Sequence, residues 1–138
     1  MKLLSYNTSE IGKKGERIAA RHLRRNGYRI LSKNLHCGKN ELDLIAQNKN
    51  YIVFVEVKTR SFDTADIAAA EEQRPAHAVH AQKRKRTIEA AGKYLYGHSN
   101  KRTPRFDVIE IYLDRSHRLK PFFINHIEGA FDARGRIH

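Results

Sequence analysis

The feature that most constrains this chain is a pair of strand-like runs that carry charges where a buried strand should be apolar. The runs cover residues 41–46 and 53–58, and a polar linker suited to a tight hairpin separates them. A strand buried on both faces normally carries no charge, and a lone buried charge is costly unless it has a partner or a metal. The charged positions of this hairpin are therefore the first candidates for function.

Strand geometry places these charges together. A tight turn that pairs Gln47 with Asn50 makes Asp43 and Glu56 diagonal neighbours, with Cβ atoms about 7 Å apart. Side chains alternate in direction along a strand. One face then carries the charged residues, which are Glu41, Asp43, Glu56 and Lys58. The opposite face is apolar and carries Leu42, Leu44, Ala46, Tyr51, Val53, Val55 and Val57.

Composition limits the class of protein and of partner. A chain of 138 residues is expected to form one domain, here residues 1–138. Its 27 Lys and Arg residues against 15 Asp and Glu residues give a formal charge of +12, which favours nucleic acid over an acidic membrane as partner. A merely soluble basic protein is the alternative. A single cysteine, Cys37, and the lack of a signal peptide or long apolar run predict a cytoplasmic protein with no membrane partner.

Periodicity and turn residues predict the order αβββ-α-ββ. Ser9 or Thr8 can cap a first helix that ends near Asn26, before Gly27. Glu16 lies at the edge of the buried stripe of this helix, where it either projects towards the sheet or is simply solvated. A strand at 28–31 and a loop at 34–39 are predicted before the hairpin. A flexible loop or lid at 59–79, with a turn or two of helix at 68–73, is predicted after the hairpin, followed by a helix at 80–96. The remaining predicted elements are strands at 105–113 and 122–127, a short helix at 128–131 and a frayed end at 134–138. Such a chain is an α/β protein with a mixed sheet flanked by helices.

Basic residues cluster at the start of the helix predicted at 80–96. The run 82–86 spreads its four cations around most of the helix, so at least one or two should face back over the hairpin. Such a run is either a solvated helix face or a phosphate-binding surface. The candidate nucleic-acid contacts are Lys13, Lys14, Arg60, Gln82, Lys83, Arg84 and Arg86. Zinc is not expected at His36 and Cys37, because neighbouring strand residues point apart and no second cysteine exists.

The chemistry that fits a one-sided carboxylate pair on a basic chain is phosphodiester hydrolysis. A divalent cation can polarise a phosphate and generate hydroxide, and Mg²⁺ (or Mn²⁺) prefers carboxylate and carbonyl oxygens. Asp43, Glu56 and the carbonyl of Val57 could supply these ligands, with Glu41 on the same face as a further acid. Lys58 could place a positive charge near the attacking water or the developing charge.

The same residues resemble a known family. Residues 40–46 and 53–60, Asn-Glu-Leu-Asp-Leu-Ile-Ala and Val-Phe-Val-Glu-Val-Lys-Thr-Arg, resemble the PD-(D/E)XK nuclease superfamily. The whole chain is similar to the YraN-type family of uncharacterised bacterial proteins, predicted endonucleases related to archaeal Holliday junction resolvases. Supporting stretches are 12–16, 27–31, Asn34, Lys83, 94–95, 105–108 and Phe131.

The resemblance implies a restriction-endonuclease-like three-layer core and a DNA substrate, branched or otherwise structured. Asp43 and Glu56 would be metal ligands, Lys58 the catalytic lysine and Glu16 an auxiliary acid. The chain departs from the pattern at Asn40, where a glycine is common, and at Leu42, where the superfamily's proline is absent. Cutting both strands of a branched substrate needs a symmetric dimer, so a second copy of the chain is also a candidate partner.

Three readings stay open at the level of sequence. The first is a metal-dependent DNA endonuclease. The second is a non-catalytic module that binds nucleic acid or a protein partner on a nuclease scaffold. The third is a purely structural arrangement of Glu56 and Lys58, for which replacing both by apolar residues would be neutral or stabilising.

Overall fold

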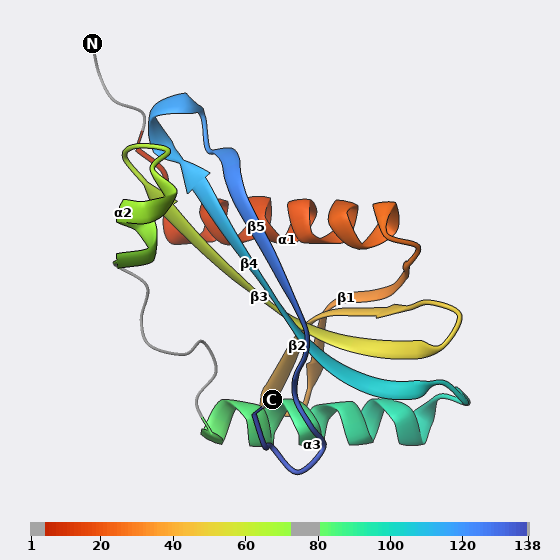
Figure 1. Cartoon of the computed structure of the whole chain (residues 1–138). Helices are drawn as coiled ribbons and strands as arrows, with labels where there is room; N and C mark the ends of the chain where they lie inside the picture. The colour runs from red at the N-terminus through yellow and green to blue at the C-terminus, as the bar shows by residue number, and fades with distance from the viewer. Residues whose placement is uncertain (1–4, 73–80, 138) are drawn as a thin grey trace.

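The computed structural model describes residues 5–72 and 81–137, which form a mixed five-stranded sheet with a helix on each face (Figure 1). The strand order is β1-β2-β3-β4-β5, and every neighbouring pair is antiparallel except β3 and β4. The elements are α1 (Thr8–Arg25), β1 (Arg29–Cys37), β2 (Asn40–Gln47), β3 (Tyr51–Phe62), α2 (Ile67–Glu72), α3 (Ala81–Gly97), β4 (Thr103–Asp114), a 3₁₀ turn (Arg115–His117) and β5 (Lys120–Phe131). The α/β class and the predicted order are confirmed, with the short helix α2 between β3 and α3.

Helix α1 lies on the sheet through a stripe of small and apolar residues. Its buried residues are Gly15, Ile18, Ala19, Ala20 and Leu23. Asn7 caps the helix, because its side chain accepts a hydrogen bond from the backbone N–H of Glu10 at 2.8 Å, so the predicted caps Ser9 and Thr8 are wrong. A Cβ atom at Gly15 would overlap the side chain of Thr59 on β3. Glycine there lets the first half of α1 approach β3 closely.

Strand β1 is longer than the sequence indicates. The loop predicted at 34–39 is wrong, because β1 continues to Cys37, which pairs with Asn40 across a turn at Gly38. Gly38 has a φ of +63°, a conformation that glycine adopts at little cost. The polar residues of β1 give it the composition of a loop, since β1 is an edge strand with one side towards solvent.

The β2–β3 turn is wider than the tight turn predicted from sequence. Gln47 pairs with Ile52 rather than Asn50, because the side chain of Asn48 accepts hydrogen bonds from the backbone N–H groups of Asn50 and Tyr51 at 2.9 and 2.8 Å. The register therefore shifts by two residues, so Ile45 rather than Asp43 faces Phe54. A shift of two keeps the side chains of β3 on their predicted faces.

Strand β2 is irregular at Asp43. Leu42 packs in the cluster that faces α3, whereas Leu44 packs in the cluster that faces α1, although residues two apart share a face in a regular strand. The predicted placement of Leu42 beside Leu44 is therefore wrong. Asn34 of β1, next to this bend, has a φ of +49°. The pairing of β2 with β3 ends at Leu44 and Val55, and β3 continues past it.

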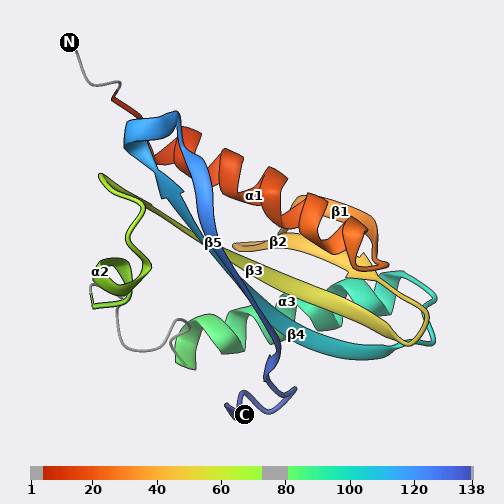
Figure 2. The ribbon, with the colours of Figure 1, turned by 45° about the horizontal axis from the view of Figure 1, so that its top comes forward.

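The segment that follows is more regular than a flexible loop or lid. Strand β3 runs to Phe62 and stays paired with β4 over its whole length, so the loop predicted from residue 59 is wrong at its start. The helical turns predicted at 68–73 correspond to α2. The rest of the predicted loop, residues 73–80, lies outside the described residues. Figure 2 shows the long β3 and β4 side by side, extending beyond the end of β2.

The end of the chain also differs from the sequence prediction. Strand β5 runs to Phe131, so the short helix predicted at 128–131 is wrong. The end predicted to fray instead turns back at Asp132, and Ile137 forms a bridge with Phe131. Backbone pairing with β4, which the local sequence does not encode, extends the strand.

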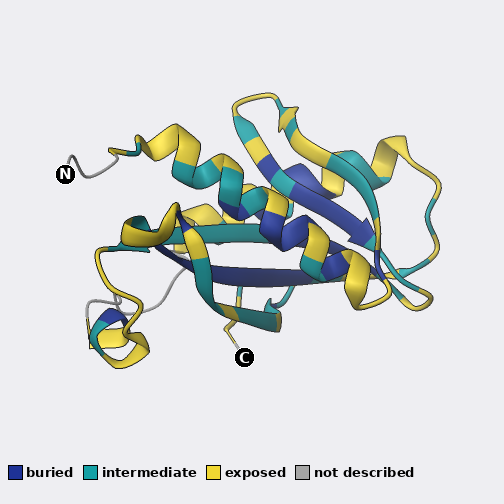
Figure 3. Ribbon diagram, turned by 90° about the horizontal axis from the view of Figure 1, so that it is seen from above, coloured by how far each residue is buried: buried dark blue, intermediate teal, exposed yellow. Residues whose placement is uncertain are grey.

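The sheet separates two apolar clusters, one under α1 and one under α3. In Figure 3 the buried residues follow the central strands and the inner side of α1, whereas α2 is mostly exposed. One buried network is polar: the Asp107 carboxylate accepts hydrogen bonds from Arg105, from His126 and from the backbone N–H of Gly129. None of the described helices is long and apolar enough to cross a membrane.

Candidate metal centre

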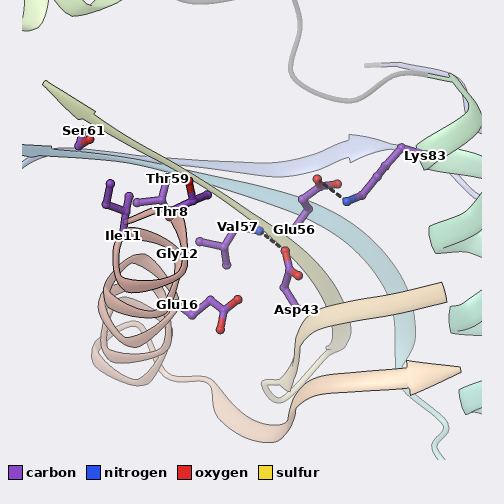
Figure 4. Close-up of a pocket in the computed structure, with 10 residues that line it drawn as sticks. All are labelled: Thr8, Ile11, Gly12, Glu16, Asp43, Glu56, Val57, Thr59, Ser61 and Lys83. Atoms are coloured by element: carbon purple, nitrogen blue, oxygen red, sulfur yellow. Dashed lines mark hydrogen bonds and ion pairs between the residues drawn. The ribbon is translucent and has the colours of Figure 1, made fainter. Parts of the chain in front are cut away.

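A cleft of about 400 Å³ opens where β2 leaves β3, next to the first half of α1 (Figure 4). Its lining residues are Thr8, Ile11, Gly12, Glu16, Asp43, Glu56, Val57, Thr59, Ser61 and Lys83. The bend in β2 turns the Asp43 side chain towards β3, and its Oδ2 accepts a hydrogen bond from the backbone N–H of Val57 at 2.9 Å. The Asp43 carboxylate thus accepts the hydrogen bond that a paired strand would accept, at a point of β3 beyond the end of its pairing with β2. Acids from a helix and from two strands meet in this cleft.

The two carboxylate oxygens of Glu56 have different surroundings. Its Oε1 lies 3.1 Å from the ammonium nitrogen of Lys83 on α3 and 4.0 Å from that of Lys58. Its Oε2 is buried and has no hydrogen-bond partner among the described residues. A buried carboxylate oxygen without a partner is unfavourable, which leaves an acceptor for a cation or a donor. Glu56 and Lys58 are expected on one face of the strand, and the distance of 4.0 Å between their charged groups agrees with this.

Asp43 is poised to exchange a proton near neutral pH. Burial raises its pKa from 3.8 to about 6, and the nearby charges of Glu56 and Glu16 act in the same direction. The hydrogen bond from Val57 and the charge of Lys83 oppose this rise. A strongly raised carboxylate pKa in a cleft is typical of functional sites.

Glu16 projects into the cleft instead of into solvent. Its Oε2 accepts a hydrogen bond at 2.9 Å from the side-chain amide of Asn34, and Figure 4 shows its carboxylate turned towards Asp43. Asn34 has a left-handed backbone conformation, which asparagine tolerates better than most residues. Of the two sequence readings for Glu16, the one that points it towards the sheet is confirmed. Asn34 supports the family resemblance at the level of sequence, but its contact with Glu16 is not predicted, since it joins residues from separate elements.

The donor set fits a hard divalent cation. The N–H and C=O of one strand residue point to the same edge, so the carbonyl of Val57 faces the open edge of β3 together with its N–H. Asp43, Glu56 and this carbonyl are oxygen donors of the kind that Mg²⁺ prefers, and Mg²⁺ usually keeps several waters. Within the described chain, no three His, Cys, Asp or Glu side chains form a ready cage. Glu41 is exposed and borders a smaller hollow beside the cleft, next to Asp43 and Glu56.

Comparison with known proteins gives the family. Residues 15–111 match the uncharacterised protein family UPF0102. A UPF0102 protein of Caldanaerobacter subterraneus subsp. tengcongensis is 41% identical over 126 residues, which cover 91% of this chain and 97% of that protein. A UPF0102 protein of Chlorobium phaeobacteroides is 37% identical over 133 residues, covering 94% and 99%. A third, of Phocaeicola vulgatus, is 38% identical over 123 residues, covering 89% and 93%. This chain belongs to the UPF0102 family.

The stretch that matches UPF0102 contains the acids of the cleft and both lysines near Glu56. The residues predicted to bind nucleic acid differ in exposure and in contacts in this UPF0102 protein. Lys13, Gln82 and Arg86 are exposed, and Arg60 is half-buried. Lys14 donates to the carbonyl of Arg118, and Arg84 donates to that of Gly135. Lys83 contacts Glu56, so one cation of the 82–86 run does face back over the hairpin.

Proposed function

We propose that this UPF0102 protein is a metal-dependent phosphodiesterase that cleaves DNA, an endonuclease with a PD-(D/E)XK-type site. The observation that carries the proposal is the acidic cleft at the split between β2 and β3. There, a buried Glu56 oxygen has no hydrogen-bond partner in the part of the chain that the structure describes, and it lies beside an Asp43 of raised pKa. A pair of carboxylates held at such a cost to stability is expected where a cation binds.

Asp43, Glu56 and the carbonyl of Val57 would hold the ion, Mg²⁺ or Mn²⁺. When bound, it would supply a Lewis acid for the phosphate and a water of lowered pKa. The chain's own part is to hold these donors in place. The N–H of Val57 fixes the Asp43 carboxylate, and Lys83 fixes one oxygen of Glu56.

Lys58 supplies the positive charge for the reaction. Its side chain is one-third exposed and lies on the same face of β3 as Glu56, with its ammonium 4.0 Å from Oε1. From there it can hydrogen-bond the attacking water or the charge that develops on the phosphate oxygens. Glu16, held by Asn34 on the other side of the cleft, can accept a hydrogen bond from a water and orient it. The formal charge of +12 favours a polyanionic substrate.

The test is cleavage of a panel of labelled DNA molecules: duplex, single strand, flap and four-way junction. Purified protein with Mn²⁺ or Mg²⁺ should cut at least one of them, and chelation by EDTA should stop the reaction. Lys58→Met should lower the cleavage rate about 100-fold or more, the size of effect seen when a single transition-state donor is removed. Binding of the divalent cation should persist, since Lys58 is not one of its ligands.

Lys49 offers a matched control, because it is an exposed lysine in the β2–β3 turn at the far end of the hairpin. Lys49→Met should cleave like the wild type. Salt-dependent DNA binding without turnover on any substrate and with either ion would contradict the proposal. It would favour instead a non-catalytic nucleic-acid-binding module on the same scaffold.

A further inference from the structure

Lys83 reaches from α3 across to the acidic cleft. Its ammonium lies 3.1 Å from Glu56 Oε1, closer than the ammonium of Lys58 at 4.0 Å. The side chain of Lys83 is 52% exposed, whereas that of Glu56 is 11% exposed, so the lysine covers the carboxylate from the solvent side. In Figure 4 it approaches Glu56 from α3, on the side opposite to Glu16.

The charges of the cleft make Lys83 a counter-ion. Among the described residues that line the cleft, Lys83 is the one cation, against the three carboxylates of Glu16, Asp43 and Glu56. Its charge lowers the pKa of Asp43, against the effect of burial. It pairs with one oxygen of Glu56, while the other oxygen has no partner within residues 5–72 and 81–137. A divalent cation at Glu56 would meet this positive charge within a few ångströms, and two cations so close repel each other strongly.

We propose that Lys83 is an exchangeable counter-ion of the site, which holds Glu56 until a divalent cation binds there and then turns to the phosphate of the bound nucleic acid. The inference rests on the proposed function, since it assigns a regulation to that same site. The long flexible stem of a lysine and its half-exposed position allow the side chain to move without displacing α3. The exchange would couple metal and DNA binding, because the cation frees a positive group for the phosphate.

The proposal predicts two effects of opposite sign when Lys83 is removed. Binding of a divalent cation should become tighter, because the competing charge is gone. DNA binding should become weaker, but only when the divalent cation is present. A lysine that merely stabilises the fold or adds to a general basic surface would not produce this combination.

The first measurement is calorimetric titration of Mn²⁺ alone, at pH 8 and low salt, into wild type, Lys83→Met and Lys83→Gln. We expect both variants to bind Mn²⁺ at least about five-fold more tightly than wild type. Lys85→Met is the matched control, because Lys85 is an exposed lysine of the same helix two residues away, where the helix turns it to another side. Equal or weaker binding by the Lys83 variants, with folding confirmed by circular dichroism, would overturn the inference.

The second measurement is fluorescence anisotropy of a labelled DNA duplex, in EDTA and in Ca²⁺. Lys83→Met should bind the duplex like wild type in EDTA and several-fold more weakly in Ca²⁺. An equal loss in both conditions would make Lys83 an ordinary phosphate contact and overturn the exchange. If Mn²⁺ binds to the wild type and the Lys83 variants bind Mn²⁺ with the same affinity as the wild type, the inference fails and the proposed function stands. If neither wild type nor the variants bind Mn²⁺, either alone or with DNA duplex present, both fail.

Discussion

Replacing Asp43 by asparagine should make the metal-free protein more stable while it abolishes metal-dependent cleavage. The folded-state pKa of Asp43 is about 6, against 3.8 for the ordinary group. Between these values the folded protein keeps a proton that the unfolded chain has released, so stability falls as pH rises through this window. Above pH 6 the ionised carboxylate destabilises the fold by up to about 3 kcal/mol, and a neutral asparagine avoids this cost.

We expect Asp43→Asn to raise the free energy of unfolding by about 1–3 kcal/mol at pH 7.5 in EDTA, measured with urea. The gain should shrink as pH falls from 6 and approach zero below the ordinary value of 3.8, where wild-type Asp43 carries its proton in both states. Glu89→Gln, which neutralises an exposed acid on α3, should change stability by less than about 0.5 kcal/mol. A variant that is less stable than wild type at pH 7.5 would contradict the burial argument.

Cleavage should respond in the opposite way. Loss of the Asp43 charge removes a ligand for the cation, and we expect at least about a 1,000-fold loss of rate on any DNA that the wild type cuts. For the same reason, metal affinity in the wild type should weaken as pH falls below about 6, since the cation must displace the proton of Asp43. An Asp43→Asn variant that is both more stable and inactive would show that the Asp43 carboxylate serves function and does not stabilise the fold.

Asp107→Ala should cause the largest loss of stability among substitutions outside the cleft. The Asp107 side chain is fully buried and accepts two hydrogen bonds from Arg105 at 2.8 Å and one from His126 at 2.7 Å. Burial alone would raise the pKa of Asp107, but its partners hold that pKa below its ordinary value. The carboxylate therefore stabilises the fold above about pH 4, and this contribution is lost as pH falls through the folded-state pKa.

Removing the carboxylate leaves the Arg105 guanidinium, only 14% exposed, with the exposed Glu128 at 3.8 Å as its remaining counter-charge. We expect a loss of about 3–5 kcal/mol at pH 7 by urea unfolding. Asp132→Ala is the surface control, because Asp132 pairs with Arg136, whose side chain is 68% exposed, and its loss should cost much less than the loss of Asp107. Similar small losses for both variants would show that the buried network adds little to stability.

Much of the cleft follows from local sequence. The alternation of a strand is enough to put Glu56 and Lys58 on one face, and helical spacing is enough to turn Ile18 and Leu23 of α1 inwards. These features depend only on periods of two and 3.6 residues, so they survive an error in register. The shift of the β2–β3 turn by two residues shows this, since it left every facing direction of β3 unchanged.

The rest depends on contacts between distant segments. At the bend of β2, Asp43 accepts a hydrogen bond from the N–H of Val57 on β3, and Asn34 of the neighbouring β1 has a left-handed backbone. No pattern in the local sequence predicts either feature. The ion pair of Lys83 with Glu56 needs the position of α3 relative to β3. The full length of β1 and β5 comes from backbone pairing with β2 and β4. Amino-acid composition does not reveal this pairing, because edge strands carry many polar residues.

The central claim is that the cleft binds a divalent cation through Asp43 and Glu56, and calorimetric titration of Mn²⁺ tests it most directly. The account predicts saturable binding to wild type at pH 8, lost in Asp43→Asn and in Glu56→Gln although both variants remain folded. The titration is repeated with DNA duplex present, because phosphate oxygens can complete the coordination shell. An absence of Mn²⁺ binding to wild type both with and without DNA, or binding that persists in both variants, would contradict the account.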